Sequence, residues 1–260
     1  MFKILKYSFF DLVRSRWSYV YLFFYLALGF VLLFLNNDLS KAVITLMNVI
    51  IILVPLIGTI FGVMYYYDSK EFTELLLAQP IKRADIFLGQ YLGVAISLSL
   101  SLLIGLGLPF ILYGLFQSTA IWDFVLLLVT GTFLTLIFTA LAFNIALYNE
   151  NKIKGFSYAI LLWLFMAVIY DGLFLMSLIL LEEYPLDTFS IGATLFNPID
   201  LSRILILLKL DISALLGYTG AVFQKFFGTG LGFSMALSAL VMWVVLPLLN
   251  IYRKSRKKDF

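Results

Sequence analysis

The side chains that most often carry catalysis or bind metals are absent or scattered in this sequence. It contains no His and no Cys, so it cannot build a zinc site, a thiol nucleophile or an imidazole general base. The run Gly232-Phe233-Ser234 is superficially similar to a serine-protease motif, but no imidazole is available to activate its Ser. No GxxxxGK[ST] phosphate loop occurs. We therefore expect a chain that is not an enzyme and that has no metal site and no cofactor of its own.

One acidic side chain, Asp171, falls inside a long apolar stretch at 156–181. An ionisable group at membrane depth is a functional hypothesis by default, because a charge in lipid is costly. The sequence places no basic residue at the same depth to pair with it. We therefore expect Asp171 to be neutral and hydrogen-bonded, or to lie near the outer interface. A proton relay is the alternative.

The rest of the composition requires a membrane. Of the 260 residues, 63% are apolar and 13% charged, and the mean hydropathy is +1.04, whereas a soluble domain has about 25% charged residues. This excludes soluble globular, disordered and coiled-coil proteins. A membrane helix needs about 20 apolar residues. The sequence predicts an all-α membrane protein, a single domain over 1–260 with six spans at about 17–35, 43–67, 91–116, 121–148, 156–181 and 229–252.

The basic residues are distributed unevenly about these spans. Fourteen of the eighteen Lys and Arg flank the N-terminus and every second loop after it, and the opposite side has only Lys41, Arg203, Lys209 and Lys225. The positive-inside rule then places both termini in the cytoplasm. The net charge of +3 is an orientation signal, and no nucleic-acid partner is expected. Residues 2–13 predict an amphipathic helix in the inner interface, with a merely basic flank as the alternative.

The cytoplasmic segment 68–90 is too long for a simple turn. Apolar residues recur at helical spacing before Pro80, and Glu71 and Glu74 lie on another face. The apolar set is Phe72, Leu75 and Leu76. Pro80 ends this short helix because it lacks an N–H donor. Such a helix could dock into a groove on a soluble partner, or it could only cover lipid headgroups.

The longest non-spanning segment, 182–228, lies on the outer side. Asn197 followed by Pro198 predicts a helix start, since Asn caps the first turn and Pro is favoured at its first position. Charged residues interrupt the apolar pattern, so we expect an extracytoplasmic helical cap before the last span, and not a seventh span. The cap could bind an external partner or form a gate, or it could only seal the bundle.

The stretch 71–93, EFTELLLAQPIKRADIFLGQYLG, resembles the signature region of the permease subunits of type-2 ABC exporters. Gln90 stands where Lys is common in that superfamily. The matching positions are Thr73, Leu75, Leu76, Leu77, Pro80, Arg83, Ile86, Gly89 and Gly93. Within the superfamily, 76–80 and 197–203 (NPIDLSR) are most similar to the permeases of the accessory ABC systems that mature nitrous-oxide reductase. Asp171 falls at the acidic position of their fifth span.

The resemblance implies a homodimer in the bacterial inner membrane, bound to two copies of a cytoplasmic ATPase that holds ATP and Mg²⁺. It also implies a periplasmic β-helical partner that handles copper. The residues implied in or beside the ATPase-coupling helix are Glu71, Glu74, Leu75, Gln79, Pro80, Arg83 and Asp85. Those implied to contact the periplasmic partner are Asn197, Pro198, Asp200 and Arg203.

Other functions remain open at this point. A type-2 ABC permease that moves a lipid, drug or polymer would share the fold and the coupling helix. A stand-alone secondary transporter would need inverted repeats or several intramembrane polar groups, and the sequence offers only Asp171. A scaffold without energy input would leave the region 71–93 unexplained.

Overall fold

The computed structural model describes residues 1–36, 38–181, 186–210 and 218–257, and no strand occurs in these ranges. In chain order the elements are α1 (Phe2–Arg14), α2 (Arg16–Asn36), α3 (Leu39–Asp68), α4 (Lys70–Leu77), α5 (Arg83–Leu112), η1 (Leu115–Gln117), α6 (Ile121–Tyr148), α7 (Lys152–Leu164), the π-helical turn η2 (Phe165–Ile169), α8 (Tyr170–Leu180), α9 (Asp187–Leu195), α10 (Pro198–Lys209), α11 (Tyr218–Phe227) and α12 (Gly230–Lys257). Because η2 continues α7 into α8, these three form one long helix.

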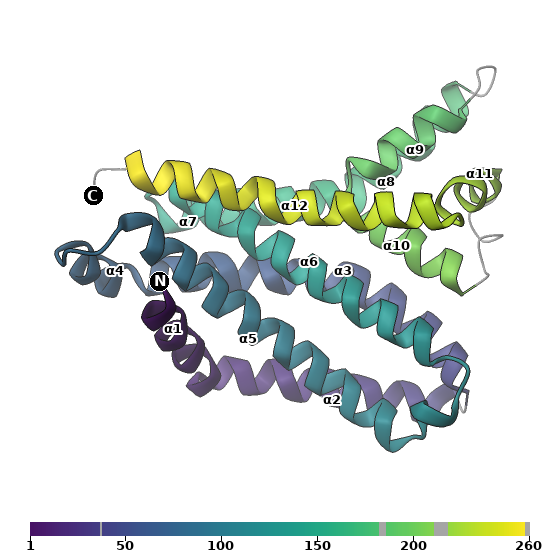
Figure 1. The fold of residues 1–260 in the computed structure, drawn as a ribbon, viewed down its shortest axis with the longest axis horizontal. Helices are drawn as coiled ribbons and strands as arrows, with labels where there is room; N and C mark the ends of the chain where they lie inside the picture. The colour runs from purple at the N-terminus through teal and green to yellow at the C-terminus, as the bar shows by residue number, and fades with distance from the viewer. Residues whose placement is uncertain (37, 182–185, 211–217, 258–260) are drawn as a thin grey trace.

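Six helices in the described part of the chain are long and apolar enough to cross a membrane, which confirms the predicted number. They are α2, α3, α5, α6, the joined α7–α8 and α12. Figure 1 shows both termini, α1 and α4 at one end of the bundle, and η1 and α11 at the other. The six spans therefore return the chain to the side on which it began. The assignment of that side to the cytoplasm stays a prediction from the basic residues.

The third span has different bounds from those predicted. α5 begins at Arg83 and ends at Leu112, whereas the apolar run predicts 91–116. The helix starts earlier because Ala84, Ile86 and Phe87 are already buried against the rest of the chain. Its 30 residues make about 45 Å of helix, longer than the roughly 30 Å hydrocarbon core. One end of α5 therefore reaches beyond the apolar layer to the segment that carries α4.

Small residues let the central helices approach closely. A Cβ added at Gly62 of α3 would lie 2.8 Å from the Ala142 Cβ of α6, and one at Gly58 would lie 3.3 Å from the Thr139 Oγ1. Gly58 and Gly62 form a GxxxG pair, which lets two membrane helices approach this closely. In α5, a Cβ at Gly105 would lie 2.6 Å from the Tyr25 Cβ of α2. The tight α3–α6 pair is the centre of the bundle.

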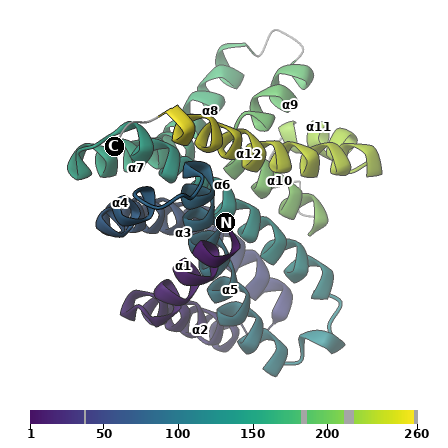
Figure 2. The ribbon, with the colours of Figure 1, turned by 60° about the vertical axis from the view of Figure 1, so that its left-hand side comes forward.

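The N-terminal helix is confirmed as a helix, and it packs across α5. Ile4, Ser8 and Leu12 recur every fourth residue and are buried. The opposing surface of α5 carries Gly89 and Gly93, and a Cβ at Gly93 would lie only 2.6 Å from the Ser8 Cβ. Figure 2 shows α1 against α5 and α2 near the end that carries α4. The location of α1 in the lipid interface stays a prediction.

Helices are also confirmed in the outer segment, although 182–185 and 211–217 of the predicted cap lie outside the described residues. α9 and α10 are bent by 115° relative to each other. By length and composition this pair also fits a broken span or a re-entrant loop, so its placement above the membrane stays a prediction. In Figure 2, α8 and α9 project together away from the main bundle. The bend returns α10 toward the fifth span, where the polar residues of both meet.

Candidate functional site

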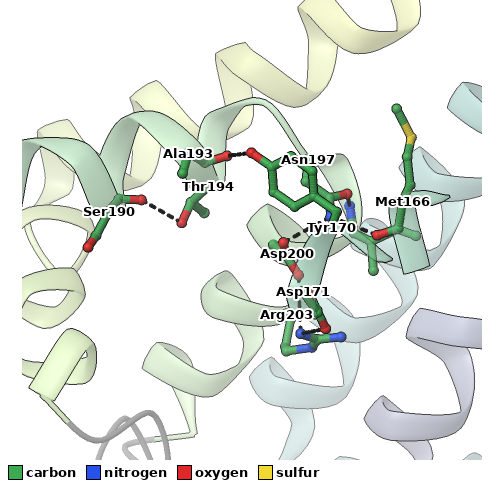
Figure 3. Close-up of polar contacts among 10 residues, drawn as sticks. Met166, Tyr170, Asp171, Ser190, Ala193, Thr194, Asn197, Asp200 and Arg203 are labelled. Atoms are coloured by element: carbon green, nitrogen blue, oxygen red, sulfur yellow. Dashed lines mark hydrogen bonds and ion pairs between the residues drawn. The ribbon is translucent and has the colours of Figure 1, made fainter. Parts of the chain in front are cut away.

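A polar cluster joins the fifth span to α10, and Figure 3 shows its members pointing toward one another. Arg203 Nη1 lies 2.7 Å from Asp171 Oδ2 and 3.1 Å from Asp200 Oδ1. Asn197 Nδ2 donates to Asp200 Oδ2 at 2.9 Å. We call Asp171, Asn197, Asp200 and Arg203 the Arg203 cluster. One guanidinium is thus shared by two carboxylates from different helices.

The start of α10 has the local sequence that places three of these side chains. Asn197 is the N-cap, and its Oδ1 accepts from the backbone N–H of Ile199 at 3.0 Å, with Pro198 at the first helical position. Asp200 and Arg203 are three residues apart, so they lie on one face of the helix. The cap therefore orients both charged side chains toward the fifth span.

The fifth span meets α10 at its π-helical turn. Asn197 Nδ2 also donates to the carbonyl of Met166, within η2, at 2.8 Å. A π-helical turn interrupts the regular hydrogen-bond ladder, and such turns recur at functional sites. One turn later, the Tyr170 hydroxyl donates to the carbonyl of Ala193 in α9 at 2.6 Å. The irregular part of the span is thus held by α9 and α10 together.

The electrostatics of the cluster favour a closed, charge-assisted contact. The side chains of Arg203 and Asp171 are 26% and 28% exposed, and that of Asp200 is 9% exposed. Partly desolvated ion pairs with direct hydrogen bonds are stronger than exposed ones. Burial and the neighbouring Asp171 carboxylate raise the pKa of Asp200 well above its ordinary value. The shorter contact, to Asp171, is therefore the main ion pair, and loss of Arg203 would leave the Asp171 carboxylate partly desolvated without its cationic partner.

The structure contradicts the expectation that Asp171 has no basic partner. Arg203 lies 32 residues away in sequence, and the bend between α9 and α10 brings it to the same depth. Asn197, Pro198 and Asp200 are buried within this chain, and Arg203 is partly exposed. Their contact with a periplasmic partner stays a prediction. Sequence reasoning missed Tyr170 and the Met166 carbonyl, since neither residue type signals a π-helical turn.

The second candidate site lies at the other end of the bundle, on α4. The helix predicted before Pro80 is confirmed, with Thr73 and Leu76 buried. Its opposite face is exposed, and Leu75 is 68% exposed there beside Glu71 and Glu74. The predicted apolar face of Phe72, Leu75 and Leu76 is therefore wrong at Leu75. The predicted coupling residues on that exposed surface are Glu71, Glu74, Leu75, Gln79 and Pro80. Leu75 is thus an apolar side chain left uncovered among acidic and polar ones.

The remaining predicted coupling residues, Arg83 and Asp85, lie in the first turn of α5. The Asp85 Oδ2 is 3.5 Å from the amino group of Met1, so this turn contacts α1. A stacked ring pair, Tyr7 of α1 and Phe72 of α4, has its centroids 4.5 Å apart. α1, α4 and the start of α5 therefore form one packed unit, which we call the α4 unit.

Gln90 ties α4 to α5 from inside the α4 unit. Its side chain is fully buried, and its Nε2 donates to Thr73 Oγ1 at 2.8 Å. Thr73 Oγ1 donates in turn to the carbonyl of Ser69. Within the described residues Gln90 Oε1 has no hydrogen-bond partner. The signal for this role was present in the sequence, because Gln90 is a polar residue that directly follows the first of the two motif glycines, Gly89 and Gly93.

The sequence matches the model of a known family over residues 9–216, which include both candidate sites; the family is described as ABC-2 family transporter protein. The chain belongs to the ABC-2 transporter family. Two curated relatives, each described as a probable ABC transporter permease protein NosY, align with it over 224 residues. The Stutzerimonas stutzeri protein is 25% identical, over 81% of this chain and 75% of its own length. The Pseudomonas aeruginosa protein is 27% identical, over 82% and 76%.

The family and these relatives identify the chain as a type-2 ABC permease similar to NosY. It is a multi-pass membrane protein and the membrane subunit of an ABC transporter, in a family of permease-type subunits that are typically non-catalytic. The α4 unit lies at one end of the bundle, whereas α10, which carries Asp200 and Arg203, packs on α3 and α6 toward the other end (Figure 1).

Replacing Asn197 by Ala tests the cap. The variant loses the bond to Ile199 N–H and the donor to Met166 and Asp200, so we expect a loss of about 2 kcal/mol of stability, read as a lower melting temperature of the purified chain. Asn151→Ala is the matched control, because Asn151 caps α7 at an exposed site and should cost about 1 kcal/mol. Equal losses from both variants would contradict a special role for Asn197.

Proposed function

We propose that this chain is the permease subunit of an ABC transporter that couples ATP hydrolysis in a cytoplasmic ATPase to an extracytoplasmic partner. In this function the complex delivers copper for the maturation of nitrous-oxide reductase in the bacterial inner membrane. Two copies of the chain would bind two ATPase subunits, which hold ATP and Mg²⁺. The partner on the far side would be a copper-handling β-helix protein.

The observation that carries the proposal is the exposed face of α4, whose opposite face is packed against α1 and α5. Leu75 is 68% exposed, while Thr73 and Leu76 beneath it are buried against the rest of the α4 unit. A partner that pushes on this face would move α1 and α5 with α4, because stacked rings and a buried hydrogen bond join them. Helices that are packed together move as rigid bodies, so the motion would reach the far end of α5.

The Arg203 cluster is suited to respond at the far end. It holds the bent α9–α10 pair to the fifth span through hydrogen bonds made by side chains, and such contacts can exchange between two arrangements. The similarity to NosY supports copper delivery as the process served. A chain without His or Cys suits a relay of motion, because its soft copper ligands are limited to scattered Met.

The alternative function is export of a lipid, drug or polymer. An apolar groove of about 500 Å³ between the fifth span and α9, lined by Tyr170, Phe174 and Phe189 among others, favours this candidate. A groove of that size falls in the range of small-molecule sites, about 300–1,000 Å³.

The test is to tag the chain, purify it from its native membranes in mild detergent and identify its companions. We expect an ABC ATPase and an extracytoplasmic β-helix protein in stoichiometric amounts, and ATPase activity in the purified complex. An ATPase without an extracytoplasmic partner would favour the exporter. Recovery of the chain without any ATPase would contradict both functions.

A further inference from the structure

A second groove, on the side of α12, is not used by either candidate site. It has a volume of about 660 Å³ and lies between α6, α9 and α12. Its lining includes Leu141 of α6, Phe196 at the end of α9, and Trp243 and Leu246 of α12. Within a bundle of membrane spans, such an apolar surface faces hydrocarbon.

The polar groups on the wall of this groove are satisfied by one another. Asn144 Nδ2 donates to the carbonyls of Ala140 and Pro247, both at 2.9 Å. Asn250 Nδ2 donates to Asn144 Oδ1 at 2.8 Å. Because these amides are paired within the protein, this part of the groove offers little to a polar solute. An apolar chain is the occupant that fits.

One end of the groove is positively charged. Lys254 follows Asn250 by four residues, so the two lie on the same face of α12. The Lys254 Nζ lies 4.5 Å from the ring centroid of Tyr148, which follows Asn144 by four residues on α6. Arg253 is exposed beside it. Among the described residues no acidic side chain forms an ion pair with Arg253 or Lys254, so their charge is open to an external anion.

We propose that this groove binds an anionic phospholipid, with an acyl chain along the apolar wall and its phosphate headgroup at Arg253 and Lys254. The charge distribution selects this occupant, since an acyl chain matches the apolar length and an anionic headgroup matches the basic end. A second copy of the chain packed face to face here would bring its own Arg253 and Lys254 to the basic end, so like charges would meet. The lipid would come from the leaflet on the side of both termini, and it would brace α12 against α6 and α9.

Trp243 reports on the groove directly, because it lies in its wall. The sequence has four Trp, so replacing Trp17, Trp122 and Trp163 by Phe leaves Trp243 as the single emitter. In phosphatidylcholine nanodiscs, a small fraction of brominated phosphatidylglycerol should quench Trp243 more than the same fraction of brominated phosphatidylcholine. Removing each basic side chain should weaken the apparent affinity for the anionic lipid about fivefold.

Matched variants separate the groove from general attraction to the surface. Arg253→Ala with Lys254→Ala should abolish the preference, and Lys3→Ala with Lys6→Ala, which removes two charges from α1 at the same end, should leave it unchanged. Ala239→Phe, one turn before Trp243, should fill the groove and also abolish the preference for the anionic lipid. Equal quenching by the two lipids, or an equal loss in the Lys3/Lys6 variant, would overturn the proposal.

Two further measurements keep the proposal testable if the single-Trp chain does not fold. Native mass spectrometry of the unaltered chain should detect retained phosphatidylglycerol, and the Arg253→Ala/Lys254→Ala variant should lose it; retention by that variant would count against the site. Because the chain has no Cys, Met242→Cys in the groove reports on a second copy. Efficient disulfide-linked dimers of this variant in membranes would show that another chain covers the groove, and would overturn the lipid assignment.

Discussion

Changing Leu75 to Asp is expected to weaken ATPase binding strongly while leaving the permease folded in the membrane. Leu75 is 68% exposed on α4, so a charge there costs the free chain little. In the proposed complex the ATPase would cover it, and the new carboxylate would be desolvated without a partner. We expect a loss of at least about 2 kcal/mol in binding, roughly 30-fold in Kd. The loss of ATPase binding is measured by co-purification and by the ATPase activity of detergent-solubilised membranes.

The controls for this prediction lie on the same end of the protein. Leu75→Met keeps an apolar side chain and should retain binding. Lys154→Glu reverses an exposed charge on α7 and should leave ATPase binding unchanged. Glu71→Lys, on the exposed face of α4, should permit assembly but separate ATP hydrolysis from the process that the complex serves. Normal ATPase recovery with Leu75→Asp would refute the docking assignment for α4.

Replacing Arg203 by Gln is expected to destabilise the contact between α10 and the fifth span by about 2 kcal/mol. Removing one partner of a buried ion pair costs about 3–5 kcal/mol, and the partial exposure of Arg203 and Asp171 reduces that loss. The loss arises because the partly desolvated Asp171 carboxylate would lose its cationic partner. It corresponds to a decrease of roughly 4–8 °C in melting temperature.

A variant of the Arg203 cluster without charged side chains tests the cause of this loss of stability. The triple variant Asp171→Asn, Asp200→Asn and Arg203→Gln removes the unpaired charge, so it should regain most of the lost melting temperature. Lys209→Ala removes an exposed basic side chain from α10 and should change the melting temperature by only about 1 °C. If the triple variant is as unstable as Arg203→Gln alone, charge pairing is not the reason for the loss.

The described helices suggest how the two candidate sites are connected. α5 runs about 45 Å from the α4 unit to the far end, and α6 packs against both α5 and α3 along its length. The α7 helix packs on α3 and leads through the π-helical turn to Asp171. A displacement of α4 would therefore be carried to the Arg203 cluster by packed helices.

Much of the architecture follows from local properties of the sequence. Long apolar runs in lipid must satisfy their own backbone hydrogen bonds, so they form helices, and the number of spans could be counted directly. The start of α10 was equally predictable, because Asn197 followed by Pro198 is a local capping signal. The amphipathic pattern likewise predicted α1 and α4. The bounds of α5 were not predictable from hydropathy, because its first turns are buried by α1 and not by lipid.

The sequence by itself determined that this protein is a bundle of membrane helices without His or Cys, since composition and periodicity act within each segment. Only the tertiary structure decided that Asp171 pairs with Arg203 and that Gln90 bonds to Thr73. These partners are 32 and 17 residues apart, and they meet because the chain bends between α9 and α10 and turns back between α4 and α5. The direction of such a bend depends on packing against distant helices, which no local pattern contains.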